Sequence, residues 1–202
     1  MKILFKVIFF LMFLPGWVIF LISAKPQASS GSIIFEKEKL RFDIADTSYI
    51  LTGDYYFNNR SNLECKTKIF YPFVVNTDLP FPHHIQVKEL INDQKVSFTK
   101  QKNGIVFYAE IPAFSTRVYR IVFHQKALKN RLEYILTTTA FWNQPLESAD
   151  FRIFLPANLE LDSLSMPYQR IKADLNGVNY FLNYKNFMPE KNLIIQWRCC
   201  HD

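Results

Sequence analysis

The chain has 202 residues, of which 49% are hydrophobic and 21% charged, a composition typical of a globular protein rather than a disordered one. Its 20 Phe and 10 Tyr favour β-structure. The 5 glycines are all isolated. This excludes a P-loop and a dinucleotide-binding motif, because both need clustered glycines. We therefore expect no nucleotide as partner. The net charge of +6 is dispersed and forms no basic stripe, so we expect no nucleic acid as partner either.

The N-terminus contains a long uncharged segment, residues 7–24. As a helix it would be about 27 Å long, just enough to cross a hydrocarbon core. Pro15-Gly16 interrupts it and Ala24 offers a small residue at a cleavage position, which favours a signal peptide over a retained anchor. We predict a signal peptide or membrane anchor over residues 1–24, with the membrane as a partner if the segment is uncleaved. The remainder is then extracytoplasmic: periplasmic, at the cell surface or secreted.

Residues 25–32 form a short polar linker containing Pro, Gly and Ser. Beyond it apolar and polar residues alternate, which places one set of side chains on one face of a sheet, and no helical periodicity is evident. The clearest alternations lie at 40–44, 105–111, 178–184 and 193–197. We predict an all-β, immunoglobulin-like two-sheet antiparallel sandwich, preceded by the N-terminal hydrophobic helix. It spans residues 33–198, and residues 199–202 form a C-terminal tail.

Turn signals separate the expected strands. Asn-Gly pairs at 103–104 and 176–177 lie between alternating segments, and such pairs accept the positive φ angles that a type I′ hairpin requires at both central positions. Asn-Asp at 92–93 is a third candidate hairpin. Residues 71–84 contain three prolines and are expected to cross between the two sheets.

Several phrases, in this order, resemble an exported bacterial β-sandwich family of unknown function. Residues 37–44 (KEKLRFDI) and 51–59 (LTGDYYFNN) are similar to its paired opening strands. Residues 134–142 (YILTTTAFW) and 145–156 (PLESADFRIFLP) resemble a strand with a Trp-containing loop and a following strand that closes on Pro. Residues 186–197 (NFMPEKNLIIQW) are like its final strand. The resemblance implies a β-sandwich and an extracytoplasmic location, and it carries over no active site.

Three cysteines lie in a compartment that permits disulfides. A bridge from Cys65 to either Cys199 or Cys200 would tie an early strand to the chain end, and the alternative is three reduced thiols. The terminal Cys199-Cys200-His201-Asp202 has metal-ligand residue types, but chain ends fray and no CxxC or HxxxH spacing supports them. We expect no metal site and no cofactor.

Nucleophilic catalysis has no sequence signature here, since there is no GxSxG motif and the four histidines lack diagnostic neighbours. The candidate ligand-binding residues are Trp142 and Asn143, with Tyr134 upstream. Exposed aromatic residues beside amides serve both carbohydrate and protein binding. The alternative is that Trp142 folds over the edge of the core, which the dominance of large aromatics in core burial favours.

These patterns predict a non-enzymatic extracytoplasmic β-sandwich module that acts through protein contacts at the cell envelope. A carbohydrate-binding module using Trp142 and nearby aromatics is the alternative. A hydrolase with two close carboxylates ranks third, because nothing singles out two among the 18 acidic residues.

Overall fold

The computed structural model describes residues 33–200, and these residues form an almost entirely β-structure. The predicted all-β class is confirmed. The predicted N-terminal helix over residues 1–24, the linker 25–32 and the last two residues of the tail 199–202 lie outside the described residues. Cys199 itself belongs to the last strand. Within residues 33–200 no helix is long and apolar enough to cross a membrane.

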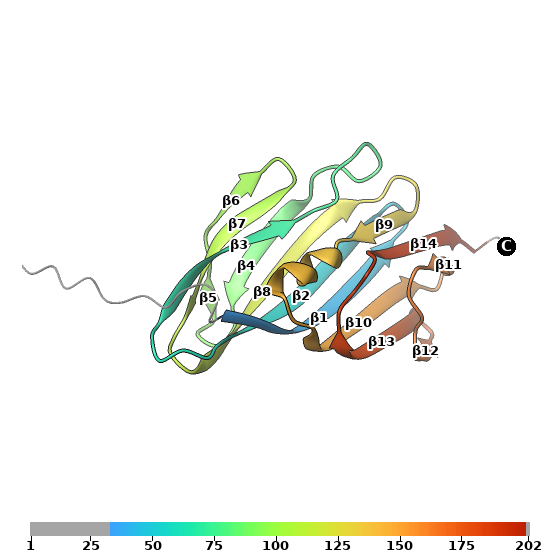
Figure 1. Ribbon diagram of the computed structural model, residues 1–202. Helices are drawn as coiled ribbons and strands as arrows, with labels where there is room; N and C mark the ends of the chain where they lie inside the picture. The colour runs from blue at the N-terminus through green and yellow to red at the C-terminus, as the bar shows by residue number, and fades with distance from the viewer. Residues whose placement is uncertain (1–32, 201–202) are drawn as a thin grey trace, which may run out of the picture.

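The largest sheet has 8 strands in the order β12-β13-β10-β1-β2-β8-β4-β5 (Figure 1). Its strands are β1 (Ile33–Ala45), β2 (Ser48–Asn59), β4 (His83–Glu89), β5 (Gln94–Lys95), β8 (Ser115–Lys126), β10 (Leu146–Pro156), β12 (Arg170–Asp174) and β13 (Gly177–Phe187). All neighbours in this sheet are antiparallel except β1 and β10, which run parallel.

Two sheets of 3 strands each accompany the large one. The first is β3 (Cys65–Pro72), β7 (Gly104–Ile111) and β6 (Phe98–Gln101), in that order. The second is β11 (Leu159–Leu164), β14 (Leu193–Cys199) and β9 (Arg131–Tyr134). As predicted, residues 71–84 cross between sheets, from the end of β3 to the start of β4.

The immunoglobulin-like two-sheet sandwich is not confirmed, and the described residues 33–200 differ from it in two respects: they form three sheets, and β1 pairs in parallel with β10. A parallel pair needs a long crossover, and here the chain from β2 to β9, with the short helix that follows β9, connects β1 to β10. Alternation of apolar residues predicts which face a side chain occupies, but it does not predict which strand lies beside which.

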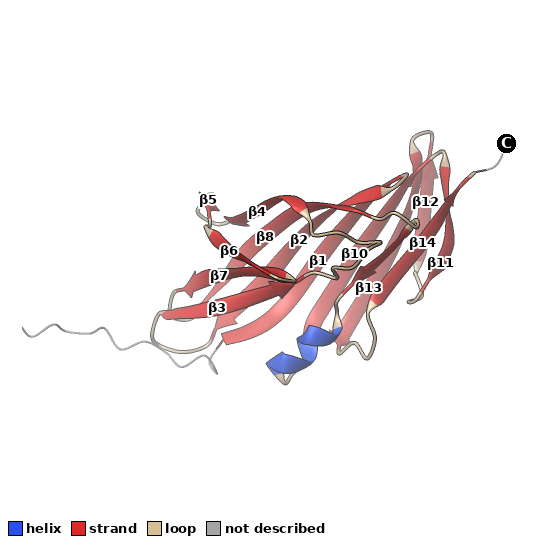
Figure 2. Ribbon diagram, turned by 90° about the horizontal axis from the view of Figure 1, so that it is seen from above, coloured by secondary structure: helices blue, strands red, loops and turns tan. Residues whose placement is uncertain are grey.

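Both small sheets lie on the same face of the large sheet. Tyr55 of β2 makes hydrogen bonds with Tyr71 of β3 and with Tyr134 of β9, so one inward-facing side chain of the large sheet touches both. Figures 1 and 2 place the two small sheets towards opposite ends of the molecule, with a short helix between them. The core fills the space between the large sheet and this divided second layer.

Strand β1 contains a β-bulge that decides which side chains face the core. Phe35 pairs with Phe57 and Lys37 with Tyr56, so Glu36 is an extra residue without a partner in the register. Before this bulge the odd-numbered residues face the core, and after it the even-numbered residues do, because one extra residue has been inserted. Glu38 consequently faces the core on the same side as Phe35.

The hairpins predicted at 103–104 and 176–177 are present, but not as type I′ turns centred on Asn-Gly. Gln101 pairs with Gly104 and Asp174 with Gly177, so each two-residue loop lies one position earlier than expected. None of the four loop residues, at positions 102–103 and 175–176, has a positive φ. In these two hairpins only Gly177, which follows the second loop, has a positive φ, of 146°. The third hairpin, between β4 and β5, includes Asp93 with a φ of 56°.

Gly53 of β2 makes room for the ring of Tyr55, two residues further along the same face. A Cβ atom at Gly53 would lie 2.7 Å from Cε2 of Tyr55 and closer still to its hydroxyl. Real Cβ atoms do not approach so closely, so the ring occupies space that only glycine leaves open.

We predict that Gly53→Ala destabilises the protein by about 1–3 kcal/mol, because the added methyl group displaces the Tyr55 ring within a packed core. Urea denaturation would measure the loss. Thr52→Ala, on the half-buried outer face of the same strand, is the control. Equal stability of the two variants would contradict the assigned packing.

Candidate functional site

A cavity of about 790 Å³ lies between the two small sheets, against the inner face of the large sheet. We call it the inter-sheet cavity. Strands β1 and β2 line its floor, β3 and β7 line one wall, and β9 lines the other. A 3-10 helix, η2 (Thr137–Trp142), which is drawn in blue in Figure 2, also contributes to the lining, as do the two residues after it and Ile121 of β8. Residues far apart in the sequence thus meet at one site.

Three tyrosines form a hydrogen-bonded group in this cavity. The hydroxyl of Tyr55 lies 2.7 Å from that of Tyr71 and 2.9 Å from that of Tyr134. All three side chains are buried. Burial raises the pKa of each hydroxyl above its ordinary value, so the group stays neutral over the physiological range.

Glu38 is an acidic residue buried at the floor of the cavity. Its side chain is only 2% exposed, and its Oε1 atom has no hydrogen-bond partner among the described residues. Its neighbours in the sheet are Tyr55 of β2 and Ala149 of β10, and the methyl group of Ala149 offers no polar contact. Burial raises the pKa of this carboxyl from 4.5 to about 8. Glu38 is therefore largely protonated at neutral pH.

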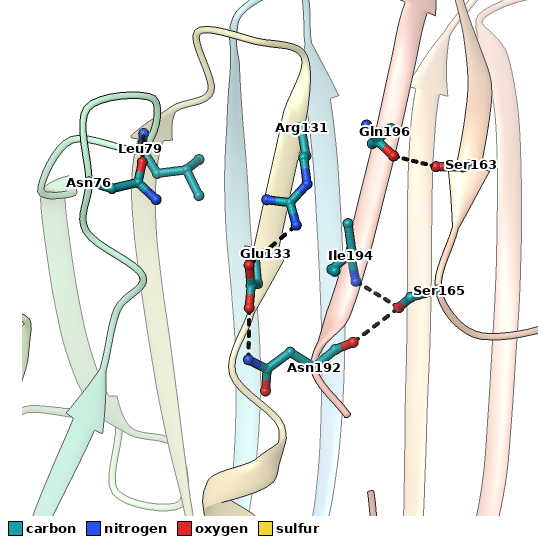
Figure 3. A network of polar contacts seen from close by, with 9 residues as sticks. All are labelled: Asn76, Leu79, Arg131, Glu133, Ser163, Ser165, Asn192, Ile194 and Gln196. Carbon is teal, nitrogen blue, oxygen red and sulfur yellow. Dashed lines mark hydrogen bonds and ion pairs between the residues drawn. The ribbon is translucent and has the colours of Figure 1, made fainter. Parts of the chain in front are cut away.

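Helix η2 is held at its start by Asn192, which precedes β14. The side-chain oxygen Oδ1 of Asn192 accepts hydrogen bonds from the backbone N–H of Leu136 at 3.2 Å and from the hydroxyl of Thr137 at 3.2 Å. Its Nδ2 group donates to Glu133 at 2.8 Å, as Figure 3 shows. Asn143, with a φ of 55°, ends the helix.

The structure places all three predicted ligand-binding residues, Tyr134, Trp142 and Asn143, in the lining of the inter-sheet cavity. Trp142 is half-buried, and its ring centroid lies 5.8 Å from that of Phe35 and 5.5 Å from that of Phe57. It is thus part of an aromatic wall that packs on the core, in η2 rather than in the expected loop.

Sequence reasoning missed Glu38 and Tyr55. Glu38 has the same parity as Leu40 and Phe42, whose alternation marks the inward face of β1. A charged residue in phase with such a series is a signal of a buried acid. Glu38 is polar and precedes Leu40, so it does not extend the apolar alternation that marks this face.

The structure does not bring together the cysteines of the predicted bridge. Cys65 is buried at the start of β3, whereas Cys199 and Cys200 are exposed at the end of β14. Figures 1 and 2 place β3 and the end of β14 at opposite ends of the molecule.

Three histidines gather away from the cavity, where β4 pairs with β8. The ring centroids of His83, His84 and His124 lie 4.8–5.6 Å from one another. Within residues 33–200, however, no group of three His, Cys, Asp or Glu side chains is arranged to hold a metal ion.

No protein-family model matches the chain, and no curated protein matches it. Solved structures do resemble its fold. A Legionella pneumophila protein assigned provisionally to nutrient binding has a TM-score of 0.69 at 14% identity, over 82% of this chain and 67% of that one. An M1 zinc metallopeptidase from Deinococcus radiodurans has a TM-score of 0.52 at 11% identity, over 82% of this chain. The chain spans only 42% of that enzyme's length. At these identities the likeness shows the fold alone.

We predict that Glu38→Gln changes stability in a pH-dependent manner. Between pH 4.5 and about 8 the native protein holds a proton that the unfolded chain releases, so wild-type stability falls as pH rises through this window. The amide of the Glu38→Gln variant does not ionise. The variant's advantage over wild type should be small at pH 5 and grow towards pH 9, by about 1.4 kcal/mol per unit of raised pKa.

Urea denaturation of both proteins at the two pH values would measure this difference. Glu190→Gln, at an exposed position, serves as the control and should show no such divergence. A pH-independent offset between wild type and Glu38→Gln would contradict the assignment of a buried acid.

We further predict that Asn192→Ala loosens η2, because the amide of Leu136 and the hydroxyl of Thr137 lose their acceptor. The loss should lower stability by about 1–2 kcal/mol. Hydrogen exchange measured by mass spectrometry should be faster in a peptide that covers residues 134–144. Asn62→Ala, at an exposed position, is the matched control. Unchanged protection in Asn192→Ala would argue against the cap.

Proposed function

We propose that this chain is a non-enzymatic, extracytoplasmic binding module that takes a small, largely apolar molecule into the inter-sheet cavity. The observation that carries the proposal is the cavity itself, with about 790 Å³ of space, aromatic walls and a few polar groups at its floor. Ligand sites in proteins are clefts of about 300–1,000 Å³ with this division between apolar walls and sparse polar groups.

The rim of the cavity supports an apolar ligand. Phe141 of η2 is 83% exposed and lines the cavity. Apolar surface held in water is unfavourable by about 25 cal/mol per Å². A ligand with an apolar body would cover this ring as it enters and so recover that free energy.

The lining of the cavity favours binding over catalysis. Glu38 is the only carboxyl among the described residues that line the cavity. Hydrolysis of a glycoside needs two carboxyl groups on opposite sides of the bond. Export rests on the predicted N-terminal segment and on the resemblance to an exported family. The provisional role of the Legionella protein in nutrient binding fits the same reading.

Two other functions are less well supported. A carbohydrate platform needs an open aromatic face, but Trp142 packs against Phe35 and Phe57. A role in protein contacts at the cell envelope is the second candidate. The likeness to the metallopeptidase favours this role. In that enzyme the region similar to this chain makes up 42% of a larger chain, so it works beside other parts of the protein.

Binding of the neutral fluorophore N-phenyl-1-naphthylamine tests the proposal. Its fluorescence rises in apolar surroundings, and we expect saturable binding to the wild-type protein. Thr67→Phe should weaken this binding at least tenfold, because Thr67 lines the cavity on β3 and the larger ring would fill the space.

Thr99→Phe, at an exposed position on β6 away from the cavity, is the matched control and should bind as wild type does. Binding that survives Thr67→Phe, or that Thr99→Phe weakens equally, would contradict the proposed site.

A further inference from the structure

We infer that the ligand of the inter-sheet cavity is an organic cation, a primary amine on an apolar body, whose ammonium group pairs with Glu38. This inference rests on the proposed function, and it names the class of molecule that the site takes.

One oxygen of the Glu38 carboxyl group, Oε1, is buried and has no hydrogen-bond partner among the described residues. A buried polar atom in this state is costly, and native proteins almost always provide a partner. Oε1 of Glu38 has none among the described residues, although the side chain lies at the cavity floor. Tyr55, its neighbour in β2, already uses its hydroxyl on Tyr71 and Tyr134. The described residues therefore leave this oxygen free to accept a hydrogen bond from a donor on a ligand in the cavity.

The charges around Glu38 are unbalanced. The titratable groups that face it are the hydroxyls of Tyr55 on β2, Tyr71 on β3 and Tyr134 on β9, and burial keeps all three neutral. On β10 the neighbour is Ala149. Lys68 is the only other charged residue in the described lining, and its side chain is exposed on β3. The floor thus holds an acid without a base, which a ligand cation would complement.

An aromatic wall stands beside the same acid. The rings of Phe35, Phe57 and Trp142 lie with centroids 5.3–5.8 Å apart and line the same cavity as Glu38. Aromatic faces attract ammonium groups and also cover apolar carbon. One wall therefore suits both parts of an amine with an apolar body.

Binding of such a cation must be linked to pH. Glu38 has to lose its proton to form the ion pair, and burial raises the pKa of its carboxyl to about 8. A simple alkyl amine is already protonated below that pH. Each molecule bound therefore releases a proton from Glu38, and the affinity should rise about tenfold per pH unit below the pKa of this carboxyl.

The test is displacement of N-phenyl-1-naphthylamine by 2-phenylethylamine and by its neutral analogue 2-phenylethanol, at pH 6, 7 and 8. We expect the amine to bind at least tenfold more tightly than the alcohol at pH 8, with an affinity that rises about tenfold from pH 6 to pH 7. The alcohol should bind independently of pH. Glu38→Gln should abolish both the preference and the pH dependence, whereas Glu190→Gln should keep them.

Equal affinity for amine and alcohol, or a preference that survives Glu38→Gln, would overturn the inference. Retained binding of the fluorophore by Glu38→Gln shows that this variant keeps the cavity. If the fluorophore binds wild type in a manner sensitive to Thr67→Phe but the amine does not displace it, the ligand class is wrong and the proposed function stands. If neither the fluorophore nor the amine binds, both fail.

Discussion

The hydroxyl group of Tyr55 joins three sheets that share no backbone hydrogen bonds with one another. Tyr55 belongs to the large sheet, and its two partners, Tyr71 and Tyr134, belong one to each of the small sheets. Tyr55 therefore contacts both small sheets from the large one, beside the ring contacts of Phe42 with Tyr134 and of Phe123 with Tyr71. Gly53 gives its ring the room it needs, and the inter-sheet cavity opens beside it. Tyr55 thus links the large sheet to both walls of the cavity.

The same arrangement explains why Glu38 is tolerated in the core. It lies directly opposite Tyr55 in the ladder, with the small Ala149 on its other side, so a carboxyl group fits where a larger apolar residue would fill the cavity. An unpaired buried acid reduces stability, and natural proteins keep such violations mainly at sites that bind or react. Burial of Glu38 lowers the stability of the protein, and the same burial strengthens the binding of a cation.

Much of the local structure follows from the sequence. The alternation of Leu40, Phe42 and Ile44 predicted one buried face of β1, and all three are buried. The hairpin sites were found because turn residues interrupt alternating segments, although the turn type was wrong. The predicted residues Tyr134, Trp142 and Asn143 do meet at one cavity.

The rest depends on contacts between distant segments. The parallel pair of β1 with β10, the division of the second layer into two sheets and the approach of Tyr71 to Tyr134 through Tyr55 leave no periodic trace in the sequence. Residues 137–142 contain three consecutive threonines, which are weak helix formers, so η2 was not expected. Asn192, distant in sequence, supplies the acceptor that its start requires.

The most direct test of a buried acid that binds a cation is an NMR titration of the Glu38 side-chain carboxyl carbon, assigned by comparison with Glu38→Gln. In the free protein we expect a midpoint of about 8. Saturation with 2-phenylethylamine should move that midpoint several units lower, because the bound ammonium group stabilises the carboxylate. A midpoint near 4.5 in the free protein would show that the carboxyl is solvated, and both the buried acid and its role in binding would be refuted.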